Sequence, residues 1–173
     1  MLRWKKSKLP SEAAQAWRAS LAPGQTDRVL AWAATVDGRL VVLGPDALSH
    51  GSGDDWRHVG WHEIERGGWN AETEQLQWQT YAGARGSAAL PDPARVPEVF
   101  RERVAASLVL EQFVPVTTGG DRGAIVSARR PPGTGAITWH TTLTRGVTWR
   151  TPGVRELADD ALRRLRQEYD EPG

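Results

Sequence analysis

Histidine and glutamate side chains gather in the segment VGWHEIERGGWN, residues 59 to 70, with His58 directly before it. His58 and His62 are four positions apart, so on a helix they would share one face and could bind zinc or serve in acid–base chemistry. In an extended strand the same two residues lie about 13 Å apart along the chain. The surrounding glycines and tryptophans favour strand and turn geometry, so we expect both histidines and Glu63 to be structural or surface residues. His50 would join them only if the fold brings it near.

The stretch GSGDD, residues 51 to 55, is the second candidate because it combines glycines with two carboxylates. A glycine-rich phosphate loop needs a following helix whose N-terminal amides face the anion. WRHVGW follows instead and is typical of a strand, which favours a hairpin turn. The sequence contains neither GxxxxGK[ST] nor GxSxG, and no histidine has a recognisable serine and acid partner. Because cysteine is also absent, we predict no catalytic residues, no metal site and no cofactor.

Basic residues that could contact a partner lie in an N-terminal arm and near residue 130. The candidates are Arg3, Trp4, Lys5, Lys6 and Lys8 in the arm, and Arg129 and Arg130 further along. Cations interleaved with apolar side chains suit a membrane surface with acidic headgroups or the phosphates of nucleic acid. A solvated terminus explains the arm as well. The net charge of +1 provides no overall attraction to nucleic acid, so we do not favour that partner.

Apolar runs separated by turn residues predict seven short strands between residues 27 and 89. Asp37-Gly38 predicts a two-residue hairpin turn between the first two runs. The segment EQLQWQTY alternates cleanly, which predicts a half-buried antiparallel strand with one apolar and one polar face. Its apolar face carries Leu76, Trp78 and Thr80, and its polar face carries Gln75, Gln77 and Gln79. Gly67-Gly68 lies within the preceding run and indicates a bulge, a close backbone approach or a groove for a peptide.

Helical periodicity appears in three places. Ser11 is placed to cap a short helix that runs to about Leu21. A second helix is predicted from about Pro97, with apolar residues at the i, i+3, i+4 spacing; this stripe comprises Val96, Val99, Phe100, Val104, Ser107 and Leu108. After Phe113 the pattern returns to two strands, at 123 to 130 and 135 to 143. An amphipathic helix over 151 to 170 closes the chain.

Seven short strands followed by an amphipathic helix resemble bacterial pleckstrin-homology-like (PH-like) and GRAM-like domains. The resemblance covers about residues 27 to 110 and rests on RLVVLGPDALSHG, W-H-E-I at 61 to 64, the LQW strand and LPDPARVPEVFRERV. It implies a partly open antiparallel β-barrel capped by a helix, which serves as a platform for phosphoinositides, peptides or protein surfaces. Lipid-binding members place several basic residues around the first loop. The loop here, residues 36 to 39, carries one acid and one base and does not fit that pattern.

These observations predict an α+β chain with three parts: a basic arm and short helix at 1 to 26, a PH-like domain at 27 to 112, and an added C-terminal β-hairpin and helix at 113 to 173. We expect a non-catalytic adaptor that binds a protein partner through a sheet edge or an arginine-bearing face. The alternative is peripheral binding to anionic membranes through the basic arm and barrel mouth. No window of 18 apolar residues predicts a transmembrane helix, and the N-terminus lacks the apolar core of a signal peptide. A cytoplasmic location, with peripheral membrane contact under the alternative, follows as the expectation.

Overall fold

The computed structural model describes residues 8 to 133 and 135 to 170. The chain forms two compact units that divide between Ala106 and Ser107; we call the described residues before the division unit 1 and those after it unit 2. The described part contains three α-helices and three antiparallel sheets, which confirms the predicted α+β class. The sheets are not closed into a barrel. None of the described helices is both long enough and apolar enough to cross a membrane.

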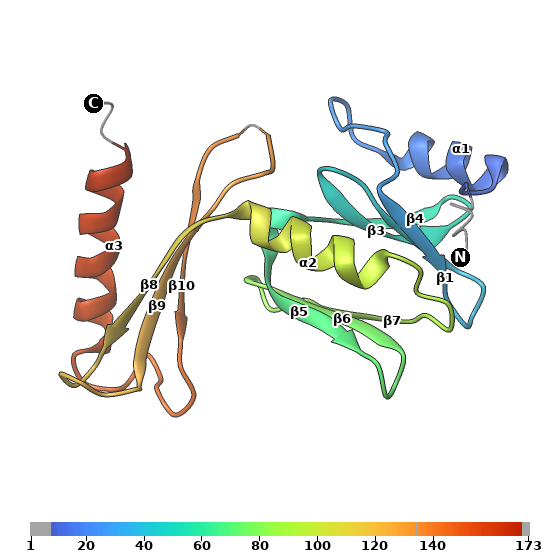
Figure 1. The fold of residues 1–173 in the computed structure, drawn as a ribbon. Coiled ribbons are helices and arrows are strands. Elements are labelled where there is room, and N and C mark those ends of the chain that lie inside the picture. The colour runs from blue at the N-terminus through green and yellow to red at the C-terminus, as the bar shows by residue number, and fades with distance from the viewer. Residues whose placement is uncertain (1–7, 134, 171–173) are drawn as a thin grey trace, which may run out of the picture. The chain divides into compact units, whose positions relative to one another are not determined.

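Unit 1 begins its β structure with a four-stranded antiparallel sheet in the order β1-β2-β3-β4 (Figure 1). Its strands are β1 (Ala31–Ala34), β2 (Leu40–Leu43), β3 (Ala47–Ser52) and β4 (Asp55–Gly60). In β2, Val41 and Leu43 belong to the main core, whereas Val42 points to the opposite face and is also fully buried. The apolar run LVVL therefore reflects a strand that is covered on both faces.

The turn between β1 and β2 differs from the predicted two-residue hairpin. Thr35 N–H donates to Arg39 O at 2.8 Å, and Gly38 N–H donates to Thr35 O at 3.1 Å. Three residues therefore separate the last paired positions. Gly38 has a φ of 81°, the left-handed conformation that glycine adopts without steric penalty at the end of such a three-residue loop. Asp37-Gly38 correctly marked the turn, but the loop is one residue longer than predicted.

A three-stranded antiparallel sheet in the order β5-β6-β7 completes the β structure of unit 1. Its strands are β5 (Ile64–Asn70), β6 (Gln75–Thr80) and β7 (Arg85–Ala89), and the 3-10 turn η1 (Trp61–Glu63) leads into β5. The predicted alternation of β6 is confirmed, because its apolar positions and Thr80 are buried while the glutamines between them are half-buried or exposed. This sheet has one face toward the core and one polar face.

Helix α2 (Val96–Ser107) packs against both sheets of unit 1 (Figure 1), and Val96, Val99, Phe100 and Val104 of its predicted stripe contribute to their shared core. The buried core residues are Ala31, Ala33, Val41, Leu43, Leu48, Trp61, Ile64, Leu76, Trp78, Ala88, Leu90, Val96, Val99 and Phe100. Phe100 is 2% exposed and meets Trp61 edge to face, with ring centroids 5.9 Å apart. The two sheets and α2 thus bury one common core.

Helix α1 (Ser11–Ser20) packs on the face of the first sheet that points away from this core. Ala14 and Trp17 are its buried residues, as the periodicity predicted. The predicted cap at Ser11 is wrong: Pro10 occupies the N-cap position, and no side chain caps the helix there. Proline fits because its fixed φ suits the entry into a helix.

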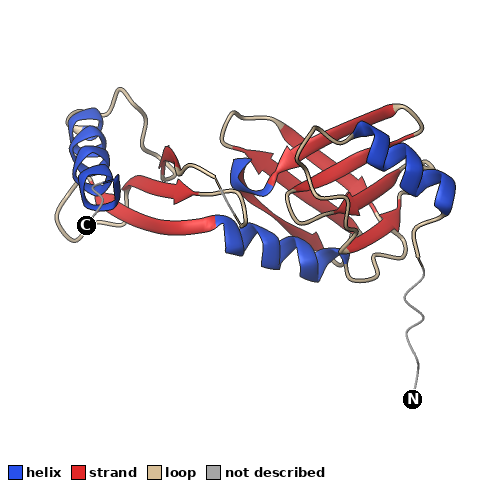
Figure 2. Cartoon of the chain, turned by 90° about the horizontal axis from the view of Figure 1, so that it is seen from above, coloured by secondary structure: helices blue, strands red, loops and turns tan. Residues whose placement is uncertain are grey.

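Unit 2 is a three-stranded antiparallel sheet with one helix. The sheet has the order β10-β9-β8, with β8 (Leu108–Pro115), β9 (Gly123–Arg129) and β10 (Thr138–Leu143). Helix α3 (Val154–Asp170) runs beside these strands (Figure 2) and covers one face of the sheet. Val126, Ala161 and Leu165 form the buried centre of this contact.

Strand β8 differs from the prediction, in which the preceding helix includes Leu108 and β structure resumes only after Phe113. Helix α2 ends at Ser107, and β8 begins at the next residue. No glycine or proline separates the two elements, so the boundary carries no breaker signal. The expected hairpin of 123 to 130 and 135 to 143 is present as β9 and β10, with β8 as a third strand.

Candidate functional site

His58, the first candidate for chemistry, lies in a hydrogen-bond network between β4 and α1. Its Nδ1 is 2.7 Å from the Oγ of Ser49, its partner on β3. Its Nε2 is 3.0 Å from Ser20 Oγ and 3.1 Å from Ser20 O, at the end of α1. The indole N–H of Trp17 also donates to Ser49 Oγ at 2.9 Å. The imidazole therefore joins the helix to the sheet through both ring nitrogens.

The atoms around His58 define its tautomer. A carbonyl oxygen can only accept, so the contact with Ser20 O places the ring proton on Nε2. If the ring is neutral, Nδ1 accepts from the Ser49 hydroxyl, which itself accepts from the indole N–H of Trp17. Ser49 is 1% exposed, and this network engages it as both donor and acceptor. The pair is a structural bridge, not an exposed nucleophile and base.

Glu63 and His62 have contacts of their own and do not share a ligand position with His58. Gly60 N–H donates to Glu63 Oε2 at 2.6 Å, which closes the η1 turn. The His62 ring packs over Gly60, where an added Cβ would lie 2.6 Å from His62 Cε1. Among the described residues, no group of three or more His, Asp or Glu side chains is arranged to hold a metal ion.

His50 lies on β3 and meets the edge of Trp78, with ring centroids 6.1 Å apart and an interplanar angle of 88°. Burial holds the pKa of His50 below its ordinary value, and the Arg39 guanidinium acts in the same direction. Both effects disfavour the protonated ring. His50 is thus a neighbour of the core, separate from the His58 network.

The predicted basic contacts fall into different surroundings. Arg3, Trp4, Lys5 and Lys6 lie outside the described residues, so the membrane alternative stays a prediction. Lys8 is exposed. Arg129 is only 5% exposed and its Nη1 donates to Ser107 Oγ at 2.8 Å, so it does not present its charge at the surface. Arg130, the next residue, is exposed.

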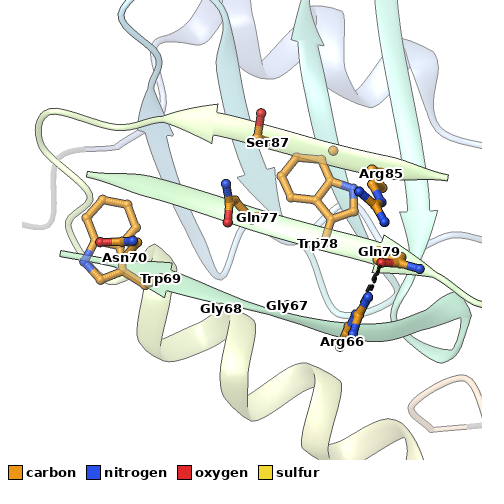
Figure 3. Close-up of a pocket in the computed structure, with 11 residues that line it drawn as sticks. Arg66, Gly67, Gly68, Trp69, Asn70, Gln77, Trp78, Gln79, Arg85 and Ser87 are labelled. Carbon is orange, nitrogen blue, oxygen red and sulfur yellow. Dashed lines mark hydrogen bonds between the residues drawn. The ribbon is translucent and has the colours of Figure 1, made fainter. Parts of the chain in front are cut away.

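A pocket of about 680 Å³ lies on the β5-β6-β7 sheet and was not among the predicted contacts (Figure 3). The side chains that alternate away from Leu76 and Trp78 form most of its lining. We call this surface the β5–β7 face; it consists of Arg66, Gly68, Asn70, Gln77, Gln79, Arg85 and Ser87. Gly67, Trp69, Trp78 and Gly86, at the alternate positions of the three strands, complete the lining.

A β-bulge brings Arg66 to this face. Ile64 pairs with Thr80, but Arg66 pairs with Gln79, so two steps on β5 oppose one step on β6. Without the bulge, Arg66 would pair with Trp78 and point toward the core. With it, Arg66 and Arg85 lie opposite Gln79 on its two sides, in one row across the three strands.

Two adjacent glycines on β5 have opposite surroundings. A Cβ on Gly67 would lie 2.5 Å from Gln77 O and 2.7 Å from Phe100 Cζ, so this position needs glycine for the close approach of α2. Gly68 points to the β5–β7 face, and an added Cβ there would meet no atom within 4 Å. Gly68 therefore leaves open space on the pocket side. The two glycines were predicted to mark a bulge, a close approach or a groove; the close approach applies to Gly67, and the bulge lies just before it.

The polar groups of the face can bind an anionic or amide-rich ligand. Arg66 donates to Gln79 Oε1 through Nε at 3.2 Å and through Nη2 at 2.8 Å (Figure 3). Arg85 is exposed, and it forms no hydrogen bond or ion pair with another described residue. No Asp or Glu side chain lines this pocket in the described chain. The face thus combines two guanidinium groups, three side-chain amides and a hydroxyl.

Comparisons with protein families, with curated proteins and with solved structures found no match to this chain.

Proposed function

We propose that this chain is a non-catalytic, PH-like recognition module that binds a protein partner through the β5–β7 face. The observation that carries the proposal is the pocket of about 680 Å³ on this face, with open space at Gly68. Polar side chains and the tryptophans Trp69 and Trp78 both line it. Ligand sites in proteins typically have volumes of about 300–1,000 Å³. This face differs from an ordinary solvated sheet because its side chains surround a hollow.

The order of elements supports the PH-like part of the proposal. Four antiparallel strands, three antiparallel strands and a helix follow one another in unit 1, and all three parts contribute to one core. A backbone hydrogen bond from Val36 N to Ala89 O (3.1 Å) joins the first hairpin to the end of β7. The two sheets remain separate ladders, so the resemblance concerns element order and packing.

The non-catalytic part rests on what the polar groups do. His58 and Ser49 bridge α1 to the sheet, Glu63 closes η1, and His50 meets the edge of Trp78. The groups on the β5–β7 face are arginines, amides and a hydroxyl, which suit recognition better than proton transfer at neutral pH. In a binding role, these arginines, amides and the hydroxyl would form hydrogen bonds with the ligand.

The dimensions of the face favour a peptide segment as the ligand. From Arg66 to Asn70 the face follows β5 for about 13 Å, and it spans three strands, or about 10 Å. An extended segment of four residues has a similar length. Side-chain amides such as Gln77 can donate to and accept from a peptide backbone, whose own polar groups need partners when water is displaced.

A random-peptide display selection tests the proposal with the full chain immobilised. We expect enriched peptides that bind the wild-type protein and bind the Gly68→Leu variant at least about tenfold more weakly, because leucine would fill the hollow. Gly68→Ala is the matched control and should retain most of the binding. Melting curves of both variants check that they fold. A selection without enrichment, or peptides that bind Gly68→Leu as well as wild type, would contradict the proposal.

A further inference from the structure

We infer that the β5–β7 face recognises an acidic, extended peptide segment, with two of its carboxylates held by Arg66 and Arg85. This inference rests on the proposed function and adds the chemistry of the partner. It requires that the two arginines act on one ligand, that their charge is not already neutralised, and that a backbone can approach the floor of the pocket.

The two arginines lie on one row of the sheet and face the same way. Each is paired in register with Gln79, from opposite sides. Two strand spacings separate their backbones, which amounts to about 10 Å. Arginine side chains are long enough to converge from this separation, and the guanidinium fork suits bidentate contacts with carboxylates. Arg66 and Arg85 are therefore placed so that both guanidinium groups can contact the same ligand.

The charge of this pair is not balanced within the pocket. Gln79 accepts from Nε and Nη2 of Arg66, which orients the guanidinium with a neutral group and leaves Nη1 available. Arg85 has no partner among the described residues. Glu72 and Glu74, the acids of the β5–β6 turn, follow Asn70 at the opposite end of the strands. The face is consequently cationic at its Arg66–Arg85 end, and a ligand with carboxylates complements it.

The neighbouring row of paired residues, Gly68, Gln77 and Ser87, offers open space and hydrogen-bonding groups to the backbone of a bound peptide. Gly68 pairs with Gln77, and Gln77 pairs with Ser87, so one position of this row has no side chain at all. A peptide can approach the open side of Gly68 while Gln77 and Ser87 bond to its amide groups. In an extended peptide, side chains two positions apart point the same way and lie about 7 Å from one another. We therefore expect acidic residues at alternate positions of the ligand.

The probe that tests this inference is a fluorescein-labelled peptide of sequence Thr-Glu-Val-Glu-Val-Thr, with Thr-Gln-Val-Gln-Val-Thr as its neutral match. Fluorescence anisotropy with the full chain at low salt should show about tenfold or greater preference for the glutamate peptide. The preference should shrink as salt increases, since exposed charge pairs are screened. Arg66→Gln and Arg85→Gln should each reduce it, and the double variant should abolish it.

The double variant Arg57→Gln/Arg101→Gln is the matched control, because it removes two exposed arginines of unit 1 that do not line the pocket. It should keep the preference for glutamate. Equal binding of the two peptides, no measurable binding of the glutamate peptide, or an equal loss in the control variant would overturn the inference. Sedimentation with phosphatidylserine vesicles that depends on Arg66 and Arg85 would overturn the choice of a peptide over a lipid surface.

Failure of this inference is separable from failure of the proposed function. If the display selection yields peptides that bind at Gly68 but show no preference for acidic residues, the recognition function stands and the acidic ligand is wrong. If no peptide depends on Gly68, the β5–β7 face is not the binding site, and both proposals fail.

Discussion

The two units bury their apolar residues in different ways. In unit 1, two sheets and α2 enclose a core of fourteen buried residues. In unit 2, α3 covers one face of a single sheet, and the buried cluster consists of three residues with four partly buried neighbours. Among the described residues, Val36 is the one exposed large apolar side chain of unit 1. The others lie in unit 2, namely Leu108, Val109, Phe113, Trp149, Leu157 and Tyr169.

This difference shows that a core enclosed by several layers leaves an outer sheet face free to carry polar side chains. Because α2 and both sheets fill the interior of unit 1, the outer face of β5-β6-β7 is not needed for packing and carries arginines and amides. In unit 2 the sheet has one helical cover, and fewer layers leave more apolar surface exposed. The polar outer face of β5-β6-β7 is thus a consequence of how the two sheets and α2 fill the core of unit 1.

The largest effect is expected from Phe100→Ala, which removes the aromatic ring that α2 places between the two sheets. The side chain is 2% exposed and packs on Trp61. We expect the free energy of unfolding of unit 1 to fall by about 3–5 kcal/mol. Hydrogen exchange followed by mass spectrometry should show faster exchange throughout β1 to β7, with β8 to β10 unchanged. Equal acceleration in unit 2 would show that the two units do not unfold separately.

Val126→Ala is the counterpart in unit 2. Val126 is fully buried at the centre of the contact between β9 and α3. Two methyl groups are lost and a cavity remains, so we expect a decrease of about 2–3 kcal/mol in the free energy of unfolding of unit 2. Faster exchange should be confined to residues 107 to 170. If β5 to β7 also lose protection against exchange, the cores of the two units do not unfold independently.

The sequence predicted the fold of unit 1 best where one face of a strand is apolar and the other polar. In β6, Leu76 and Trp78 alternate with glutamines, and this period directly specifies which side chains reach the core. The helical spacing of the apolar residues in α2 likewise indicated which side of the helix is buried. Where a strand follows a helix without a breaker, the pattern fails: Leu108 continues the helical spacing of Val104 but belongs to β8. Short apolar runs cannot distinguish these two alternatives.

The candidate site could not be predicted because it depends on register and docking. A single bulge determines whether Arg66 faces the core or the pocket, and the sequence does not show how β5 pairs with β6. The network of His58 joins it to Ser20, thirty-eight positions earlier, through the docking of α1. Gly67-Gly68 was the one local signal at the site, and it left the choice between a bulge, a close approach and a groove open.

Substitution of the two adjacent glycines sharpens the distinction between the packed and open faces of unit 1. Gly67→Ala should lower the free energy of unfolding by about 1–2 kcal/mol, because the new Cβ would clash with Gln77 O and the ring of Phe100. Gly68→Ala should be neutral or slightly stabilising, since its Cβ enters open space and the unfolded chain loses freedom. Urea unfolding of both variants measures the difference. Equal losses would mean that Gly68 does not face an open surface.

The smallest expected effect is a pH dependence that His50 gives to unit 1. Burial beside Trp78 is the main cause of the lowered pKa of His50; Arg39 and Arg57 lower it further, while Asp37 and Asp55 act in the opposite direction. As the pH falls below the ordinary histidine value, the unfolded chain takes up the proton before the folded chain does. Protonation therefore favours unfolding, and this contribution levels off once the pH is below the folded pKa.

The variant His50→Gln removes this titration and keeps a polar side chain at the same position. Between pH 7.5 and pH 5, urea unfolding should show a steeper loss of stability for the wild-type chain than for the variant. Carboxylates and the remaining histidines are common to both proteins, so they cancel in the comparison. The difference should appear in the exchange rates of β3 and β6, the strands that carry His50 and Trp78, and not in unit 2. Parallel stability curves would show that the environment of His50 does not disfavour its protonated form.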